Sequence, residues 1–363
     1  MALHQKPKLR RLMGVAAVAF IIGLLYMMRA ELQANIPLRK SLGAHTLPRV
    51  AKVSMLYGKP NSNYEGAIKS HQQHAARWGY PMHVLRQDIA VGFWNKPTYL
   101  LATIVDELIK PADKRVQWMM WVDADSIILN PAIPAEIFLP PSDLDDIHVV
   151  ASQDHNGLNT GIVFVRVHPW TVTMLSETIG YPLHHPEVEL GRNADQDVMA
   201  GIFKKTDGGP EGKGYADAVV FMPRPLINAY QFSHGFEGEK GSFLVHFPGL
   251  EDERWPAMAN WIHTLETTPN EWERPAAETD YLNKTDRFWS QVRQARKAIR
   301  LVEKNLPSLE NVTRERKQDA DAVKVALKTL RETLRGKADD LELMRTDIEE
   351  LHRLTTVMGL PSE

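Results

Sequence analysis

The feature that most constrains this chain is an apolar run that ends in two carboxylates. Residues 118–122 are all apolar, and Asp123 and Asp125 follow them, separated by a single alanine. Such a run is typical of a strand buried in an α/β sheet, and these sheets bind ligands at the carboxyl ends of their strands. Two acids this close stay ionised only where water or a cation balances them. Because hard oxygen ligands suit Mg²⁺ or Mn²⁺, which commonly also hold a phosphate, the sequence predicts a metal–diphosphate site.

Two other interpretations of the acidic pair stay open at this point. An acidic turn after a strand would produce the same pattern without any ligand. Phosphatases of the haloacid dehalogenase type also end a strand in Asp-x-Asp, with the first Asp as nucleophile and with a Lys and further acids downstream. Residues of those types occur in this chain as Lys204, Asp195 and Asp197.

Composition bounds the class of protein. The chain has 363 residues, of which 44% are hydrophobic and 24% charged, so it can bury a large core in one or two domains. Its net charge of −2 gives no reason to expect a nucleic-acid partner. It has no cysteine, which excludes disulfides and Cys-ligated zinc and leaves the redox compartment undetermined.

The N-terminus predicts a membrane anchor. An uncharged stretch over residues 12–28 ends at Arg29, and as a helix it would reach roughly 26 Å, enough for a thin bilayer. Four basic residues precede it: Lys6, Lys8, Arg10 and Arg11. They favour a cytoplasmic tail over residues 1–11 and a lumenal remainder. No small-x-small site follows the stretch, so we expect an uncleaved signal anchor rather than a signal peptide, with residues 29–48 as a stem.

From residue 49 onward, short apolar runs alternate with helical stretches. We predict strands over residues 50–57, 80–86, 116–122, 147–152, 161–167, 218–222 and 242–247, and helices over 61–79, 97–109, 169–180, 194–204 and 254–266. This alternation argues for an α/β domain over residues 49–268, with a mainly parallel sheet and helices on both faces. No Gly-x-Gly-x-x-Gly follows the first strand, which counts against a dinucleotide-binding fold.

The last third of the chain changes character. Residues 269–284 are polar and contain proline, as in a linker, and residues 285–358 are charged and helical. Apolar residues recur there at alternating spacings of three and four, at Val323, Leu327, Leu330, Leu334, Leu341, Met344, Ile348 and Leu351. This pattern fits a coiled coil that joins copies or partners, and it equally fits helices that pack on each other or on the preceding domain.

Six segments, in this order, carry a resemblance that spacing alone does not. They are residues 57–86, with Tyr-Gly-Lys-Pro-Asn-Ser-Asn-Tyr-Glu at the start; Trp94-Asn-Lys-Pro; Trp121-Val-Asp-Ala-Asp-Ser; residues 153–170, with Gln-Asp-His-Asn-Gly-Leu-Asn-Thr-Gly at the start; Ala194-Asp-Gln-Asp-Val; and Val245-His-Phe-Pro-Gly. Together they resemble glycosyltransferase family 34, the fungal galactosyl- and mannosyltransferase group that also includes plant xylosyltransferases. The resemblance covers residues 50–265.

The resemblance implies a type II Golgi membrane protein with a GT-A fold. It implies a nucleotide-sugar donor, a glycan acceptor, Mn²⁺ and retention of the anomeric configuration. Asp123 and Asp125 match the family's metal motif, and His246 matches its third metal ligand. Mn²⁺ accepts an imidazole beside carboxylates more readily than Mg²⁺, which is the alternative ion.

Further roles follow from the same resemblance. Asn159, Thr160 and Gly161 match the donor-sugar loop, in which Gly would let the backbone approach a ligand, although a plain tight turn fits too. Asp154 and His155 in the same loop would touch the sugar or the acceptor. Lys96 would pair with the diphosphate, or else its charge would face solvent.

Asp195 and Gln196 match the family's acidic-Gln pair beside the anomeric carbon. They would stabilise an oxocarbenium-like centre while the acceptor enters from the leaving-group side. The rival mechanism is a covalent intermediate on Asp195 or Asp197. From the residues alone, Asp195 could simply be a helix N-cap. Trp94 and Trp170 are candidate sugar platforms, with core packing as the alternative.

The segment after His246 bears on the substrate. It lacks the Cys and Lys that the plant members carry there, which favours the fungal branch. We therefore expect galactose from UDP-galactose as the donor, with mannose from GDP-mannose as the alternative. The alternative hypothesis without catalysis is a silent Golgi scaffold that binds partners through its C-terminal helices.

Overall fold

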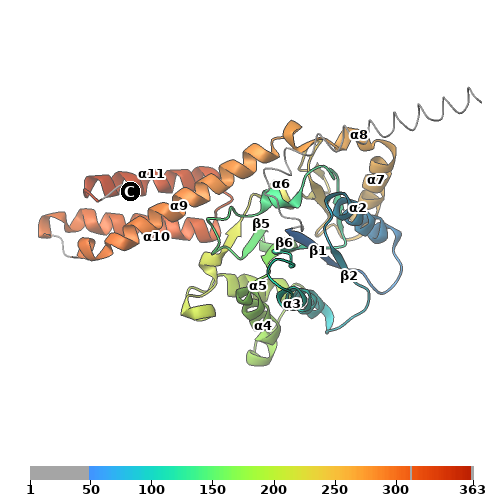
Figure 1. Ribbon diagram of the computed structural model, residues 1–363, viewed down its shortest axis with the longest axis horizontal. Coiled ribbons are helices and arrows are strands. Elements are labelled where there is room, and N and C mark those ends of the chain that lie inside the picture. Colours follow the sequence, from blue (N-terminus) through green and yellow to red (C-terminus); the bar gives the residue numbers. More distant parts are fainter. Residues whose placement is uncertain (1–48, 311–312, 361–363) are drawn as a thin grey trace, which may run out of the picture. The chain divides into compact units, whose positions relative to one another are not determined.

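The computed structural model describes residues 49–310 and 313–360 (Figure 1). The predicted tail, membrane anchor and stem, at residues 1–11, 12–28 and 29–48, lie outside this part. None of the helices in the described ranges combines the length and the apolar character needed to cross a membrane.

The centre of the molecule is a six-stranded sheet in the order β2-β1-β3-β6-β5-β7. Its strands are β1 (Val50–Met55), β2 (Met82–Leu85), β3 (Trp118–Val122), β5 (Val149–Asp154), β6 (Gly157–Arg166) and β7 (Val219–Phe221). Strand β6 runs antiparallel to both of its neighbours, and the other adjacent pairs are parallel. The predicted α/β fold with a mainly parallel sheet is therefore confirmed.

Helices cover both faces of this sheet. On one face, apolar side chains of α3 (Asn95–Leu108), α4 (Pro169–His184) and α5 (Ala194–Phe203) form the larger core with the sheet. On the other face lies α2 (Ser62–Trp78), against which α7 (Arg254–Thr267) packs. Asn61 caps α2 by accepting hydrogen bonds from the backbone amides of Asn63 and Tyr64, and Gly79 ends the helix at a φ of 74°.

One predicted strand, over residues 242–247, belongs to a small second sheet and not to the central one. Within the predicted strand 242–247, only β10 (Leu244–His246) is extended, and it pairs antiparallel with β4 (Ser126–Ile128), outside the central sheet. This pairing sets His246 opposite Ser126, the residue after Asp125. The remaining short elements are α6 (Arg224–Ile227), β8 (Gln231–Phe232), β9 (Gly235–Phe236) and 3₁₀ turns at Gly92–Trp94, Ala135–Phe138, Pro210–Gly212, Ala216–Ala218, Glu251–Glu253, Ala276–Glu278 and Arg314–Arg316.

The C-terminal region folds into three helices that pack on one another. They are α9 (Tyr281–Glu310), α10 (Lys317–Gly336) and α11 (Leu341–Val357), preceded by α8 (Pro269–Trp272) within the predicted linker. The apolar stripe is divided between α10 and α11, because α10 ends at Gly336. Its buried members, including Leu330 and Leu351, lie among these helices, as in the alternative in which the helices pack on each other. Association with another chain stays a prediction.

These helices also pack on the central domain. The ring of Tyr281, at the start of α9, lies edge-on to Phe138, and its hydroxyl accepts a hydrogen bond from the backbone amide of Phe243 at 2.8 Å. Arg335 of α10 forms two hydrogen bonds with Asp217, at 2.7 and 2.8 Å. All described residues accordingly fall within one compact unit, residues 47–363.

Candidate active site

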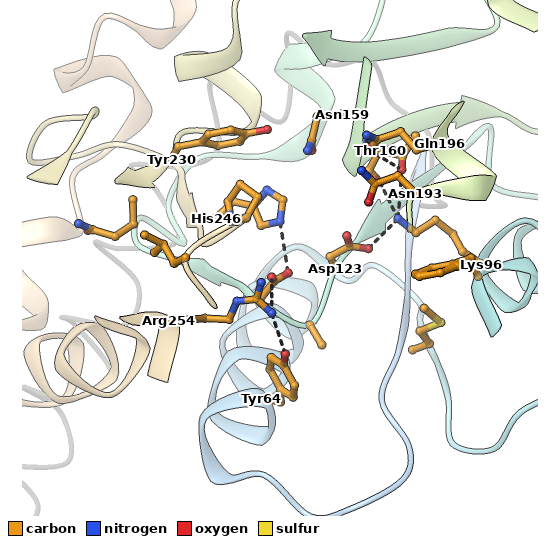
Figure 2. A pocket seen from close by; sticks show the side chains of 18 of the residues that line it. Tyr64, Lys96, Asp123, Asn159, Thr160, Asn193, Gln196, Tyr230, His246 and Arg254 are labelled. Carbon is orange, nitrogen blue, oxygen red and sulfur yellow. Dashed lines mark hydrogen bonds and ion pairs between the residues drawn. The ribbon is translucent and has the colours of Figure 1, made fainter. Parts of the chain in front are cut away.

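A cavity of about 970 Å³ opens at the carboxyl ends of β1, β3 and β5 (Figure 2). Ten of the eleven site residues that we derived from the sequence line it: Lys96, Asp123, Asp125, Asp154, His155, Asn159, Thr160, Asp195, Gln196 and His246. The eleventh, Gly161, lies directly against the imidazole of His246. The structure therefore brings together residues between positions 96 and 246 of the sequence, several of them next to the ends of neighbouring strands of the central sheet.

Three of these side chains could hold a metal ion. The ligand atoms of Asp123, Asp125 and His246 all lie within 4.8 Å of one another. Asp123 follows β3, and its Oδ1 accepts a hydrogen bond from the indole nitrogen of Trp121 at 2.6 Å. His246 Nε2 is 3.2 Å from Asp125 Oδ1. The donor set of two carboxylates and one imidazole suits a divalent ion such as Mn²⁺.

A chain of hydrogen bonds sets the tautomer of His246. The backbone amide of Gly161 donates to Asn159 Oδ1, so the group of Asn228 that faces this oxygen at 2.9 Å is its amide nitrogen. The carboxamide oxygen of Asn228 then faces His246 Nδ1 at 2.8 Å and accepts its proton. The lone pair of Nε2 therefore points at Asp125, where a proton or a metal ion is needed between the two atoms.

Gly161 is required by this arrangement. A Cβ at residue 161 would lie 2.2 Å from His246 Cε1 and 2.8 Å from Nε2. The close neighbour that excludes a side chain is thus the imidazole, whereas the sequence suggested a ligand. The carbonyl of Gly161 also accepts the backbone amide of Asp123 at 2.8 Å, which ties β6 to the acidic turn.

Lys96 lies on the side of Asp123 that faces away from His246 (Figure 2). Its Nζ is 3.0 Å from Asp123 Oδ1 and donates to the carbonyl and hydroxyl oxygens of Thr160, each at 3.2 Å. Burial lowers the pKa of Lys96, but the carboxylates of Asp123 and Asp195 outweigh it and raise the pKa above its ordinary value. Lys96 is therefore a buried cation, and the alternative in which its charge faces solvent is wrong.

Arg254 supplies a second cation that the sequence analysis missed. It is the first residue of α7, its Nη1 lies 3.4 Å from Asp125 Oδ2, and the same nitrogen donates to the hydroxyl of Tyr64 at 3.2 Å. The only signal in the sequence was a basic residue eight positions after His246, in the segment without the plant members' Lys. Asn228 carried no comparable signal.

Asp195 and Gln196 lie in the first turn of α5. The helix begins at Ala194 after Asn193, so Asp195 is not its N-cap residue. Asp195 is buried, and burial together with Asp123 raises its pKa despite the opposing effect of Lys96. Gln196 Oε1 accepts a hydrogen bond from the backbone amide of Thr160 at 2.9 Å, which couples the helix to residues 159–161. These residues lie within strand β6 because Asn159 pairs with Ser152 of β5, so the prediction that they form a loop is wrong.

Four residues that the sequence analysis also considered do not line the cavity. Asp197 and Lys204 are exposed on α5 and at its C-terminal end, which removes Asp197 as a nucleophile and leaves the phosphatase set unassembled. Trp170 stacks on His148 with ring centroids 4.8 Å apart, in the core. Trp94 is partly buried and packs against the same core, as in the core-packing alternative for both tryptophans.

Residues 141–254, which include much of this site, match the sequence profile of the galactosyl transferase GMA12/MNN10 family. This part of the chain is similar to that family, glycosyltransferase family 34. It is 26% identical over 222 residues to an alpha-1,2-galactosyltransferase of Schizosaccharomyces pombe, an alignment that covers 51% of this chain and 56% of that protein. A probable alpha-1,2-galactosyltransferase of the same organism is 28% identical over 127 residues, or 31% and 32% of the two chains. The chain thus spans about half or less of the length of these two relatives.

Among solved structures, the chain is similar to a glycosyltransferase involved in the glycosylation of the major capsid of PBCV-1. The two are 15% identical with a TM-score of 0.47, over 59% of this chain and 100% of the other.

The rim of the cavity holds the remaining predicted residues. Asp154 ends β5, and its Oδ2 accepts a hydrogen bond from the hydroxyl of Tyr230 at 2.8 Å. His155 follows in the exposed turn between β5 and β6. The aromatic residues Tyr57, Phe93 and Phe232 line the cavity, where Trp94 and Trp170 do not.

Proposed function

We propose that this chain is a metal-dependent glycosyltransferase that moves a hexose from a nucleotide sugar to a glycan acceptor. The observation that carries the proposal is the pair of aspartates, Asp123 and Asp125, that share one cavity with His246 and are flanked by two cations. A binding site for a sugar diphosphate needs this combination, because the diphosphate brings negative charge that carboxylates alone would repel.

The ligands of the ion would be Asp123, Asp125 and His246. Mn²⁺ is the proposed ion, with Mg²⁺ as the alternative, and when bound it would neutralise the diphosphate as it becomes the leaving group. Lys96 and Arg254 approach the two aspartates from opposite sides, and each can donate hydrogen bonds to phosphate oxygens. A bound diphosphate would then exchange these two ion pairs for contacts with its own oxygens.

The sugar would lie between residues 159–161 of β6 and the first turn of α5. Asn159 and Thr160 present polar groups near the start of β6, and Gln196 is oriented by the backbone amide of Thr160. Asp195 is buried in the first turn of α5 and interacts electrostatically with Lys96. We infer a retaining reaction in which Asp195 and Gln196 stabilise positive charge at the anomeric carbon. A covalent intermediate on Asp195 is the rival mechanism.

Galactose from UDP-galactose is the proposed donor, in keeping with the names of the relatives. Mannose from GDP-mannose is the second candidate. The basic tail and apolar stretch at residues 6–28 support a single-pass type II protein of the Golgi membrane with a lumenal catalytic domain. A silent scaffold that acts through its C-terminal helices is the competing function, and the complete set of metal-ligand types argues against it.

The test is transfer from labelled UDP-galactose and GDP-mannose by the purified full chain, with Mn²⁺ or with a chelator. We expect metal-dependent release or transfer of galactose, and loss of at least about 100-fold in the Asp123→Ala and Asp125→Ala variants. Asp106→Ala, an exposed acid on α3, is the matched control. Full turnover by both aspartate variants would refute the metal site at Asp123 and Asp125, and silence of the wild-type chain with both donors would favour the scaffold.

A further inference from the structure

Behind the acidic turn lies a buried lysine whose polar contacts are both with histidines. Lys52 is in the middle of β1 and is fully buried. Its Nζ lies 2.8 Å from His71 Nδ1 and 3.1 Å from His74 Nδ1, and both of these α2 side chains are fully buried as well. Buried lysines are normally paired with acids, so this arrangement calls for an explanation.

Counting protons shows that this cluster can be uncharged and fully hydrogen-bonded. His74 Nε2 lies 2.8 Å from the carbonyl oxygen of Ile133, so this nitrogen carries the proton and Nδ1 is an acceptor. His71 Nε2 lies 3.1 Å from the carbonyl oxygen of Ser126, with the same consequence. Lys52 must donate to both Nδ1 atoms, and a neutral amine has two protons to give. Burial holds the pKa of Lys52 well below its usual range, as it does for both imidazoles.

One arm of the cluster reaches the turn that carries the metal motif. His71 Nε2 lies 3.0 Å from Ser126 Oγ, and this hydroxyl donates to the carbonyl of Asp123 at 2.6 Å. The backbone amide of Ser126 donates to the same carbonyl at 3.1 Å. The other arm, through His74, ends at Ile133, away from the acids. The two histidines therefore share the Lys52 contact but differ in what they hold.

We propose that Lys52 and His71 are positioning residues that fix the backbone of the turn Asp123–Ser126 through Ser126, with His74 orienting Lys52. An uncharged network suits this place, because a lysine cation there would oppose the ion that the turn is proposed to bind. The link to metal binding rests on the proposed function, whereas the restraint on the turn does not.

Two histidine variants separate positioning from general packing. His71→Phe and His74→Phe each remove a buried imidazole from the same helix and break one contact with Lys52, but only the first frees Ser126. Exchange of the amide hydrogens in the peptide that contains residues 123–126 is measured without metal by mass spectrometry, and Mn²⁺ affinity by electron paramagnetic resonance on the purified full chain. We expect faster exchange and about tenfold weaker Mn²⁺ binding for His71→Phe, with much smaller changes for His74→Phe.

Two more variants guard against misfolding. His71→Gln, which can still donate to Ser126, should recover part of the loss, and Lys52→Met should resemble His71→Phe in exchange and in Mn²⁺ affinity. Equal exchange and equal Mn²⁺ affinity in the two phenylalanine variants would overturn the positioning role, as would wild-type exchange in Lys52→Met. A wild-type chain that does not bind Mn²⁺ would contradict the proposed function, while the exchange data would still decide whether the cluster holds the turn.

Discussion

Gly161 and His246 are in direct contact: the imidazole of His246 occupies the space where a side chain at residue 161 would begin. A Cβ on Gly161 would be 2.2 Å from His246 Cε1, closer than any real contact of this kind. Residues from β6 and β10 are thereby packed against each other at the place where Asp125 lies 3.2 Å from the imidazole. Gly161 of β6 thus determines where the proposed metal ligand His246 can lie.

Replacing Gly161 with Ala should displace His246 and weaken Mn²⁺ binding by about 10- to 100-fold, because the ring cannot keep its place between Asn228 and Asp125. Titration of the full chain with Mn²⁺ measures this. Gly201→Ala, in α5, is the matched control, since nothing lies within 4 Å of a Cβ at that position. Unchanged Mn²⁺ affinity in Gly161→Ala would exclude His246 as a ligand in the observed position.

Replacing Arg254 with Ala should weaken binding of UDP by about 10- to 100-fold, the range expected when a charged hydrogen bond to a phosphate is lost. Binding of Mn²⁺ alone should not weaken, because Arg254 neutralises Asp125 in the absence of a ligand. Calorimetry with UDP and with Mn²⁺ separates the two effects. Arg86→Ala, which removes an exposed arginine paired with Glu65, should change neither. Loss of both affinities in Arg254→Ala would instead indicate a structural role.

Replacing Tyr281 with Phe should lower the free energy of unfolding by about 1–3 kcal/mol, because the buried amide of Phe243 loses its hydrogen-bond partner. Urea denaturation measures this change. Tyr181→Phe, which removes a hydroxyl from a half-buried ring on α4, should have a smaller effect. Equal stability of wild type and Tyr281→Phe would show that this hydrogen bond does not contribute to holding α9 on the central domain.

Replacing His148 with Phe should make the protein more resistant to acid. Burial, together with the nearby charges of His168, Arg166 and Arg296, lowers the pKa of His148 to about 3 from an ordinary value of 6.5. Below pH 6.5 the unfolded chain therefore binds a proton that the folded chain refuses, and stability falls as the pH drops. The variant should remove a slope of about 1.4 kcal/mol per pH unit between pH 6 and pH 4. Parallel stability profiles of the two proteins over this range would show that His148 takes up its proton in the folded state.

Much of the fold follows from local patterns. The apolar run at residues 118–122 and the alternation of strands and helices predict β1, β3, α2 and the mainly parallel sheet, because burial on both faces requires continuous apolar strands. The pattern over residues 323–351 was less informative. A stripe at spacings of three and four states which face of a helix is buried but not what covers it, and here the stripe is shared between α10 and α11.

The candidate site was predictable where residues lie in recognisable segments and not elsewhere. Asp123, Asp125 and His246 belong to such segments and converge on one cavity. Asn228 and Arg254 do not: Asn228 follows α6 and contacts His246, and Arg254 begins α7. The tryptophans show the reverse. Trp94 and Trp170 lie in segments that resemble the family, yet Trp170 belongs to the core, Trp94 packs against it, and neither lines the cavity.

The sequence by itself determined the elements, the sheet type and the chemical kinds of residue at its carboxyl edge, because apolar periodicity and strand direction act over short stretches of chain. Only the tertiary structure decided which nitrogen of His246 faces the acids, that Lys96 is buried, and that Lys52 lies between two histidines. These properties depend on contacts between residues far apart in the chain, and such contacts depend on packing rather than on local pattern.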